Sequence, residues 1–160
     1  MIWTEWDPLK EIIVGRVYDP HDIAHIEDTD FRNGLQRIFE ESEEDFFDLA
    51  ELFESYGVKV HRPNCEYKGD FRYPALCPRD MHLVYGDQVV GTIGGDPNRF
   101  YERAHYDSIM VNLKRRYTAM PTPTLGSFYQ PYVAHEGTPL YHAANILKCG
   151  DTLIHTAPYN

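Results

Sequence analysis

The stretches YGDQVVGT (residues 85–92) and CGDTLIHT (residues 149–156) match each other at an offset of 64 residues. In each, a Gly-Asp pair stands between two short apolar runs, an arrangement typical of a β-hairpin. We therefore predict one hairpin from strands at 81–85 and 88–93, and a second from strands at 141–147 and 152–156. An internal repeat of this kind indicates a fold built from one structural unit used more than once.

The segments around the hairpins complete this unit. The spacing of apolar residues predicts a helix at 99–116 and a strand at 117–120, which gives the order ββαβ from the first hairpin onward. Nearer the N-terminus, a strand at 10–17, a long loop at 18–33, a helix at 34–56 and a strand at 58–61 form an earlier, less regular copy. The sequence thus predicts an α/β fold of repeated ββαβ units.

The second hairpin is followed by neither a helix nor a returning strand. A repeated unit that cannot cover its own apolar face needs a neighbour on both sides. A length of 160 residues is enough for one ordinary domain. The repeat nevertheless leads us to expect that residues 1–160 form a single partial domain whose further units are missing.

The predicted helix at 34–56 has one apolar stripe and one acidic face. Two interpretations of the acidic face stay open: a docking surface for a basic partner, or a solvated helix face, which is what charge blocks on helices usually are. The acidic face comprises Glu40, Glu41, Glu43, Glu44, Asp45, Asp48, Glu51 and Glu54.

The charge balance argues against two classes of partner. Fifteen Lys and Arg against 25 Asp and Glu give a net charge of −10, which disfavours binding to nucleic acid or to an anionic membrane surface. The sequence contains no apolar run long enough to span a membrane and no targeting leader at the N-terminus. We expect a soluble, cytoplasmic protein.

Weaker motifs point to no cofactor and no metal. The Gly-rich loop GTIGGDPN (residues 91–98) could cradle a phosphate, but it matches no nucleotide-binding pattern and is more simply a flexible turn. His21 and His25 are the one histidine pair at helical spacing, and no other ligand lies at a fixed spacing from them. Ser127 is not part of a hydrolase elbow, because G-x-S-x-G is absent.

Three cysteines, Cys65, Cys77 and Cys149, occur without a C-x-x-C pair. An odd number of unpaired cysteines argues against a disulfide framework and against a tetrahedral zinc site. We expect reduced thiols, most of them buried.

The first candidate for chemistry is CPRDMHLVYGD, where Arg79 and Asp80 come directly before a buried strand. A shielded carboxylate suits a guanidinium, because its two oxygens match two N–H donors. The structural alternative is that Asp80 pairs with Arg79 or caps the turn.

The second candidate is PLYHAANILKCGD, where His142 and Asn145 lead into the equivalent strand of the next unit. His142 could act as an acid or a base near neutral pH. Its alternative role is that of a hydrogen-bonded structural residue.

Three blocks of this sequence resemble the amidinotransferase family, the glycine and inosamine amidinotransferases of the pentein superfamily. The blocks are EWDPLKEIIVGR, CPRDMHLVYGDQVV with the following NRFYERAHYDSI, and PLYHAANILKCGDTLIHT, in the family's order. The resemblance implies a five-bladed α/β propeller of ββαβ modules around a central site, of which this chain is the N-terminal part. It also implies transfer of an amidino group from arginine to an amine acceptor through a covalent cysteine intermediate.

The resemblance assigns substrate contacts residue by residue. Asp80 matches a family acid that lines the substrate site, while the family's FDAAD motif falls on residues 141–145, so that His142 and Asn145 replace its two carboxylates. The family's catalytic histidine and nucleophilic cysteine belong to later modules, and none of the three cysteines of this chain matches the nucleophile. The catalytic residues are therefore unassigned, and the substrate-binding candidates are Asp80, His142 and Asn145.

Three functional hypotheses follow. The first is an incomplete, inactive portion of an amidinotransferase, with arginine and an amine acceptor as substrates and with a missing C-terminal half or a second copy as partner. The second is a non-catalytic module that binds a guanidinium or another cationic ligand or partner. The third, which is the weakest, is catalysis by His142 and Cys149 of this chain.

Overall fold

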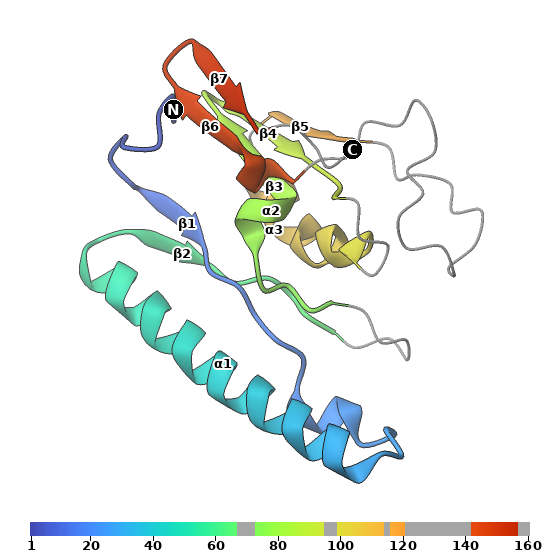
Figure 1. Cartoon of the computed structure of the whole chain (residues 1–160). Helices are drawn as coiled ribbons and strands as arrows, with labels where there is room; N and C mark the ends of the chain where they lie inside the picture. Colours follow the sequence, from blue (N-terminus) through green and yellow to red (C-terminus); the bar gives the residue numbers. More distant parts are fainter. Residues whose placement is uncertain (67–72, 95–98, 114–115, 121–141, 157–160) are drawn as a thin grey trace, which may run out of the picture.

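The computed structural model describes residues 1–66, 73–94, 99–113, 116–120 and 142–156. The described part is an α/β structure with three small sheets and one long helix (Figure 1). This confirms the predicted fold class, whereas closure of the units into a propeller stays a prediction.

The N-terminal unit consists of strand β1 (Glu11–Ile13), helix α1 (Thr29–Ser55) and strand β2 (Lys59–His61). The two strands pair in parallel, with Ile12 opposite Val60, so that α1 is the crossover between them. Helix α1 begins before the predicted residue 34, because the side chain of Asp28 accepts a hydrogen bond from the backbone N–H of Phe31 and caps the helix there.

The segment predicted as a long loop at 18–33 is shorter and more structured than expected. It contains the 3₁₀ helix η1 (Pro20–Ile23), which is capped by Asp19 and precedes α1. Ile23 and Tyr18 are buried against Phe39 of α1. This segment therefore closes a small core.

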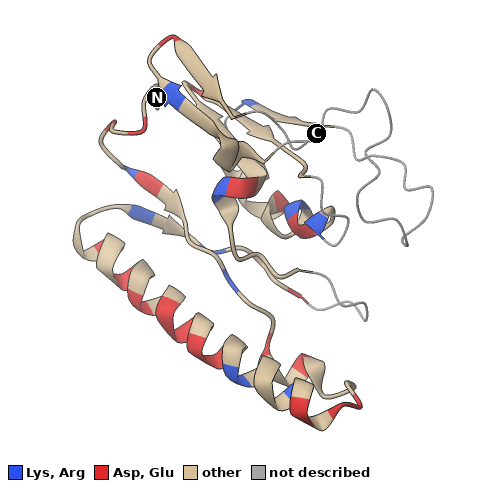
Figure 2. Ribbon diagram, viewed as in Figure 1, with Lys and Arg blue, Asp and Glu red and all other residues tan. Residues whose placement is uncertain are grey.

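Helix α1 lies on the outer side of the β1–β2 pair (Figure 1), and its acidic residues recur along its whole length (Figure 2). Seven of the eight predicted acidic residues are exposed. Glu43 is the exception: it is half-buried and accepts a hydrogen bond from Arg62 at 2.8 Å. Its assignment to the outer face was wrong, because its place on the helix borders the buried stripe.

The second unit follows the predicted order ββαβ. Strands β3 (His82–Tyr85), β4 (Gln88–Gly91) and β5 (Arg116–Ala119) form one sheet, in which β3 and β4 are antiparallel and β4 and β5 are parallel. The single helix predicted at 99–116 was wrong. In its place are the 3₁₀ helix η3 (Glu102–Tyr106) and the short helix α3 (Asp107–Asn112).

The second hairpin consists of strands β6 (Ile146–Cys149) and β7 (Thr152–His155). Its turn repeats that of the first hairpin, because Gly86 and Gly150 both have positive φ angles, 63° and 68°. The internal repeat is thereby confirmed at the hairpins. Strand β6 begins later than predicted, since the 3₁₀ helix η4 (Ala143–Asn145) precedes it.

The N-terminal residues connect the two hairpins. Ile2 forms a bridge with Gly86, and Thr4 forms one with Cys149. The backbone N–H of Gly150 donates to the carbonyl of Trp3, whose indole packs edge-on against Tyr85 with ring centroids 5.0 Å apart.

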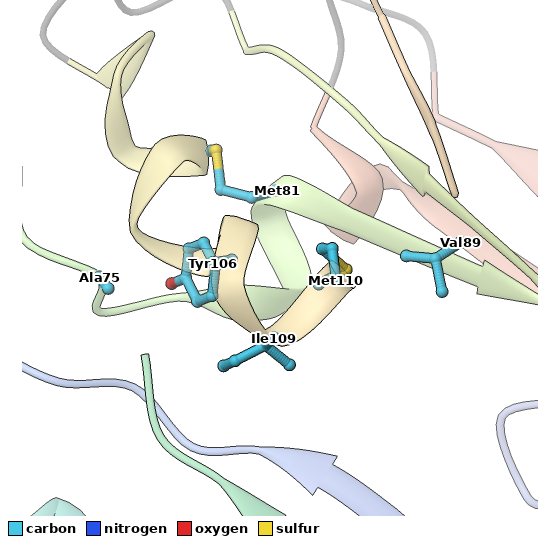
Figure 3. Packing of buried hydrophobic residues seen from close by; sticks show 6 residues of the cluster. All are labelled: Ala75, Met81, Val89, Tyr106, Ile109 and Met110. Atoms are coloured by element: carbon cyan, nitrogen blue, oxygen red, sulfur yellow. The ribbon is translucent and has the colours of Figure 1, made fainter. Parts of the chain in front are cut away.

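The main core lies between the second sheet and the helices η3 and α3 (Figure 3). Gly15 brings the N-terminal unit against this core, since a Cβ atom there would lie only 2.8 Å from the carbonyl oxygen of Ala75, and closer still to that of Leu76. The buried cluster is made of Ala75, Met81, Val89, Tyr106, Ile109 and Met110. None of the helices in the described residues has the length and the apolar character that crossing a membrane requires.

Candidate functional site

The two sequence candidates meet where the short helix α2 (Pro78–Met81) packs against η4. Thr92 joins them: its hydroxyl donates to the carbonyl of Asp80 at 2.9 Å and accepts a hydrogen bond from the backbone N–H of Ala143 at 3.2 Å. Arg79 adds a hydrogen bond to the carbonyl of Ala144 at 3.3 Å. Asp80 and the segment from His142 to Asn145 therefore belong to one hydrogen-bonded junction, which is fixed through its backbone.

The carboxylate of Asp80 is held by a guanidinium of this same chain. Nη1 of Arg99 donates to Oδ2 of Asp80 at 2.7 Å. Arg79 instead pairs with Glu5 at 3.5 Å, and α2 has no side-chain cap. The predicted structural alternatives for Asp80, a pair with Arg79 or a cap, were therefore wrong, because the partner comes from the segment that follows the Gly-rich loop.

Arg99 is in turn anchored by Glu102, which is fully buried. Nε of Arg99 donates to Oε2 of Glu102 at 2.7 Å, and the ring of Tyr73 lies 5.9 Å from the guanidinium carbon. Burial opposes the charge on Arg99, but the hydrogen bonds to Glu102 and Asp80 outweigh it and raise the pKa of Arg99. Burial raises the pKa of Glu102, partly offset by Arg99.

Arg99 and Glu102 were not among the sequence candidates. Their spacing of three residues permits a side-chain pair on one helical turn, and this was the only signal available. That Arg99 would reach Asp80, 19 residues earlier, depends on the path of the chain between β4 and η3.

His142 is packed against the end of the Gly-rich loop. A Cβ atom on Gly94 would overlap the imidazole ring of His142, so glycine at this position is required by the close approach. Residues 95–98 of the predicted phosphate loop, and Tyr141 beside His142, lie outside the described residues. Asn145 is half-buried and its backbone carbonyl accepts a hydrogen bond from the N–H of Thr156 at 3.1 Å.

The three cysteines are free thiols, but the expectation that most are buried was wrong. Cys77 is exposed, and Cys65 and Cys149 are intermediate. Burial of the thiol raises the pKa of Cys65 to about 11. Partial burial, with the nearby carboxylate of Asp80, also raises the pKa of Cys77. Neither environment favours the nucleophilic thiolate.

His82 follows Asp80 by two residues and is buried in the core. Its ring packs edge-on against Tyr106, with centroids 4.9 Å apart, and lies 6.1 Å from the ring of Tyr117. In the described part of the chain its ring nitrogens have no hydrogen-bond partner of good geometry. Burial lowers the pKa of His82 to about 4, so the ring is neutral at pH 7.

No group of three or more His, Cys, Asp or Glu residues is placed to hold a metal ion within the described ranges. The pair His21 and His25 has other contacts: the backbone N–H of His21 donates to Asp19, and Nδ1 of His25 lies 3.0 Å from the carbonyl oxygen of Asp22.

Comparison with known proteins confirms the resemblance to amidinotransferases. The chain is 26% identical over 189 residues to a putative inosamine-phosphate amidinotransferase 2 of Streptomyces griseus, and 27% identical over 188 residues to inosamine-phosphate amidinotransferase 1 of Streptomyces glaucescens. These matches cover 96% of this chain and 54% of each relative. The chain therefore spans about half the length of these relatives.

A second group of relatives and two solved structures are also amidinotransferases. The chain is 26% identical over 153 residues to the mitochondrial glycine amidinotransferase of Danio rerio. This match covers 76% of the chain and 35% of that protein. An amidinotransferase of the saxitoxin pathway from Microseira wollei has a TM-score of 0.70 at 22% identity, covering 96% and 53% of the two chains. The inosamine-phosphate amidinotransferase of Streptomyces griseus has a TM-score of 0.67 at 24% identity, covering 96% and 54%. No family model matches the chain.

Proposed function

We propose that this chain, which resembles amidinotransferases over nearly its whole length, supplies the part of such an enzyme that holds the guanidino group of arginine during amidino transfer to an amine. The observation that carries the proposal is the junction of α2 with η4. There, Asp80 and the His142–Asn145 segment, which the resemblance assigns to the substrate site, share one hydrogen-bonded framework through Thr92.

Asp80 is the substrate contact in this proposal. Its Oδ2 is taken by Arg99, and among the described residues no donor is bound to Oδ1. Its side chain is 24% exposed, so an N–H group of a ligand can reach it. Its backbone is fixed on both sides, since its N–H donates to Cys77 and its carbonyl accepts from Thr92, which holds the carboxylate in place before a ligand arrives.

In this proposal, the chain by itself binds arginine but does not transfer the amidino group. Transfer needs a thiolate that attacks the guanidinium carbon, and the environments of Cys65 and Cys77 both raise the thiol pKa. Cys149 lies in the second hairpin beside Thr4 and outside the α2–η4 junction. Catalysis by His142 with Cys149 therefore has no geometric support.

The alternative function is a non-catalytic module that binds a guanidinium or another cationic ligand. Its supporting observation is that His142 and Asn145 bring no negative charge to the positions where the resemblance implies carboxylates. The two proposals share the Asp80 contact. They differ in whether the protein in its natural full-length form releases ornithine from arginine in the presence of an amine.

The shared contact is tested by titrating the ¹⁵N-labelled protein with L-arginine and following the backbone amides. We expect shifts of the amides of Asp80, Thr92 and Ala143, with a Kd in the millimolar range or below. Asp80→Asn removes the charge and should weaken binding at least fivefold.

The matched control is Asp87→Asn, at the other end of β3, where the side chain is exposed in the hairpin turn. This variant should bind arginine as the native chain does. Equal binding by the native chain and Asp80→Asn, or an equal loss in both variants, would refute the assignment of Asp80 to the substrate site.

A further inference from the structure

Behind Asp80 lies a buried ion pair, Arg99 with Glu102, whereas Arg79 at the same junction is 58% exposed and pairs with Glu5. Glu102 has no exposed side-chain surface, and Arg99, which is 16% exposed, lies between it and Asp80. Of these three groups Asp80 is therefore the outermost, Arg99 stands directly behind it, and Glu102 is enclosed by the protein. A ligand at Asp80 thus meets the positive charge of Arg99 before the negative charge of Glu102.

This order of charges changes what Asp80 can bind. A free carboxylate binds a guanidinium through two parallel N–H···O hydrogen bonds, one to each oxygen. Here Arg99 already donates to Oδ2 at 2.7 Å, and its own charge repels a second guanidinium at the same carboxylate. This repulsion is stronger than it would be in water, because both groups are largely shielded from solvent: the side chain of Arg99 is 16% exposed and that of Asp80 is 24% exposed.

The geometry points to Arg99 as a specificity residue: it weakens the binding of charged guanidinium groups at Asp80 relative to neutral ureido groups of the same shape. A ureido group donates its N–H to Oδ1 without being repelled by Arg99. This inference rests on the proposed function, because it requires that the ligand contacts Asp80. It predicts that the chain discriminates poorly between L-arginine and L-citrulline.

The experiment measures the Kd of the chain for both ligands by NMR titration and compares their ratio among variants. Replacing Arg99 alone would leave Glu102 buried without a partner, so the test uses the double variant Arg99→Gln with Glu102→Gln, in which both side chains can still form hydrogen bonds. We expect the native Kd values to lie within about threefold of each other, and the double variant to shift the ratio toward arginine by about fivefold or more.

Arg99→Lys is the matched variant, since it keeps the positive charge beside Asp80. Its ratio of the two Kd values should stay close to the native ratio. A purely structural role of Arg99 would change both affinities together and leave their ratio unaltered in every variant. An unaltered ratio in the double variant, or the same shift in Arg99→Lys, therefore overturns the inference.

Failure of the proposed function gives a different result. If Asp80→Asn leaves the Kd for both ligands unchanged, or if neither the native chain nor the double variant binds either ligand, the ligand does not contact Asp80. The proposed function and this inference then fall together. If Asp80→Asn weakens binding but the ratio does not respond to Arg99, the inference alone is wrong.

Discussion

The burial of His82 should make the protein less stable in acid by an amount that follows from its pKa. In the folded chain this pKa is lowered to about 4 from the ordinary 6.5 because the ring is buried. Between pH 4 and pH 6.5, His82 therefore binds a proton in the unfolded chain but not in the folded chain. The stability contributed by neutral His82 is therefore fully present above pH 6.5 and is lost as the pH falls toward 4.

At 1.36 kcal/mol for each pKa unit, the lowered pKa of His82 reduces the unfolding free energy of the native chain by about 3 kcal/mol at pH 4 relative to pH 7.5. His82→Gln cannot take up the proton. Urea unfolding at pH 7.5 and pH 4, followed by circular dichroism, should therefore show that His82→Gln gains about 3 kcal/mol in unfolding free energy relative to the native chain between the two conditions.

The same substitution at exposed His155 on β7 is the control and should keep the native pH dependence. A gain below about 1 kcal/mol for His82→Gln, or an equal gain for both variants, would refute the conclusion that His82 is buried in its neutral form.

Three further predictions concern packing and the thiols. Gly15→Ala places a methyl group against the carbonyl oxygens of Leu76 and Ala75 and should lower the unfolding free energy by about 2 to 3 kcal/mol. Gly34→Ala, in α1 with open space around it, should raise it by up to about 1 kcal/mol, and equal effects in urea unfolding would contradict the close approach at Gly15. Gly94→Ala should displace the ring of His142, seen as a shift of its ¹H–¹³C imidazole signals, whereas unchanged signals would contradict that contact. Desolvation raises the pKa of the half-buried Cys65 to about 11 from 9.0. Cys65 should therefore react with iodoacetamide at pH 8 about a hundredfold more slowly than an unperturbed thiol, as measured by mass spectrometry. A rate equal to that of an unperturbed thiol would show that the sulfur of Cys65 is not shielded from water.

The hairpins were predictable because their signals are local. The Gly-Asp pairs at 86–87 and 150–151 fix both turns, and both glycines have the positive φ that this turn requires. Helix α1 was also predictable from its apolar stripe. Its start was missed because Asp28, the capping residue, lies in a segment without apolar periodicity.

The helix predicted at 99–116 failed for a different reason. Three residues of that apolar spacing, Phe100, Ile109 and Met110, are buried. Periodicity alone, however, does not separate one long helix from a 3₁₀ turn followed by a short helix, which bury residues at similar intervals.

That Asp80 and the second candidate segment would lie close together followed from the repeat, but their contacts did not; their role as a substrate site stays a prediction. The sequence identified Asp80 and the segment from His142 to Asn145, and the structure brings these together at α2 and η4. The partner of Asp80 was not predictable, because Arg99 reaches it from a position 19 residues away. Long-range pairing of this kind depends on the tertiary fold, and neither spacing nor composition encodes it.

The central claim is that Asp80 holds the guanidino group of arginine, and the most direct test is a crystal structure of the chain with L-arginine bound. We expect guanidino density within hydrogen-bonding distance of Oδ1 of Asp80, with Arg99 still bound to Oδ2. Arginine bound elsewhere on the chain, or a well-occupied ligand that leaves Oδ1 without a contact, would contradict it.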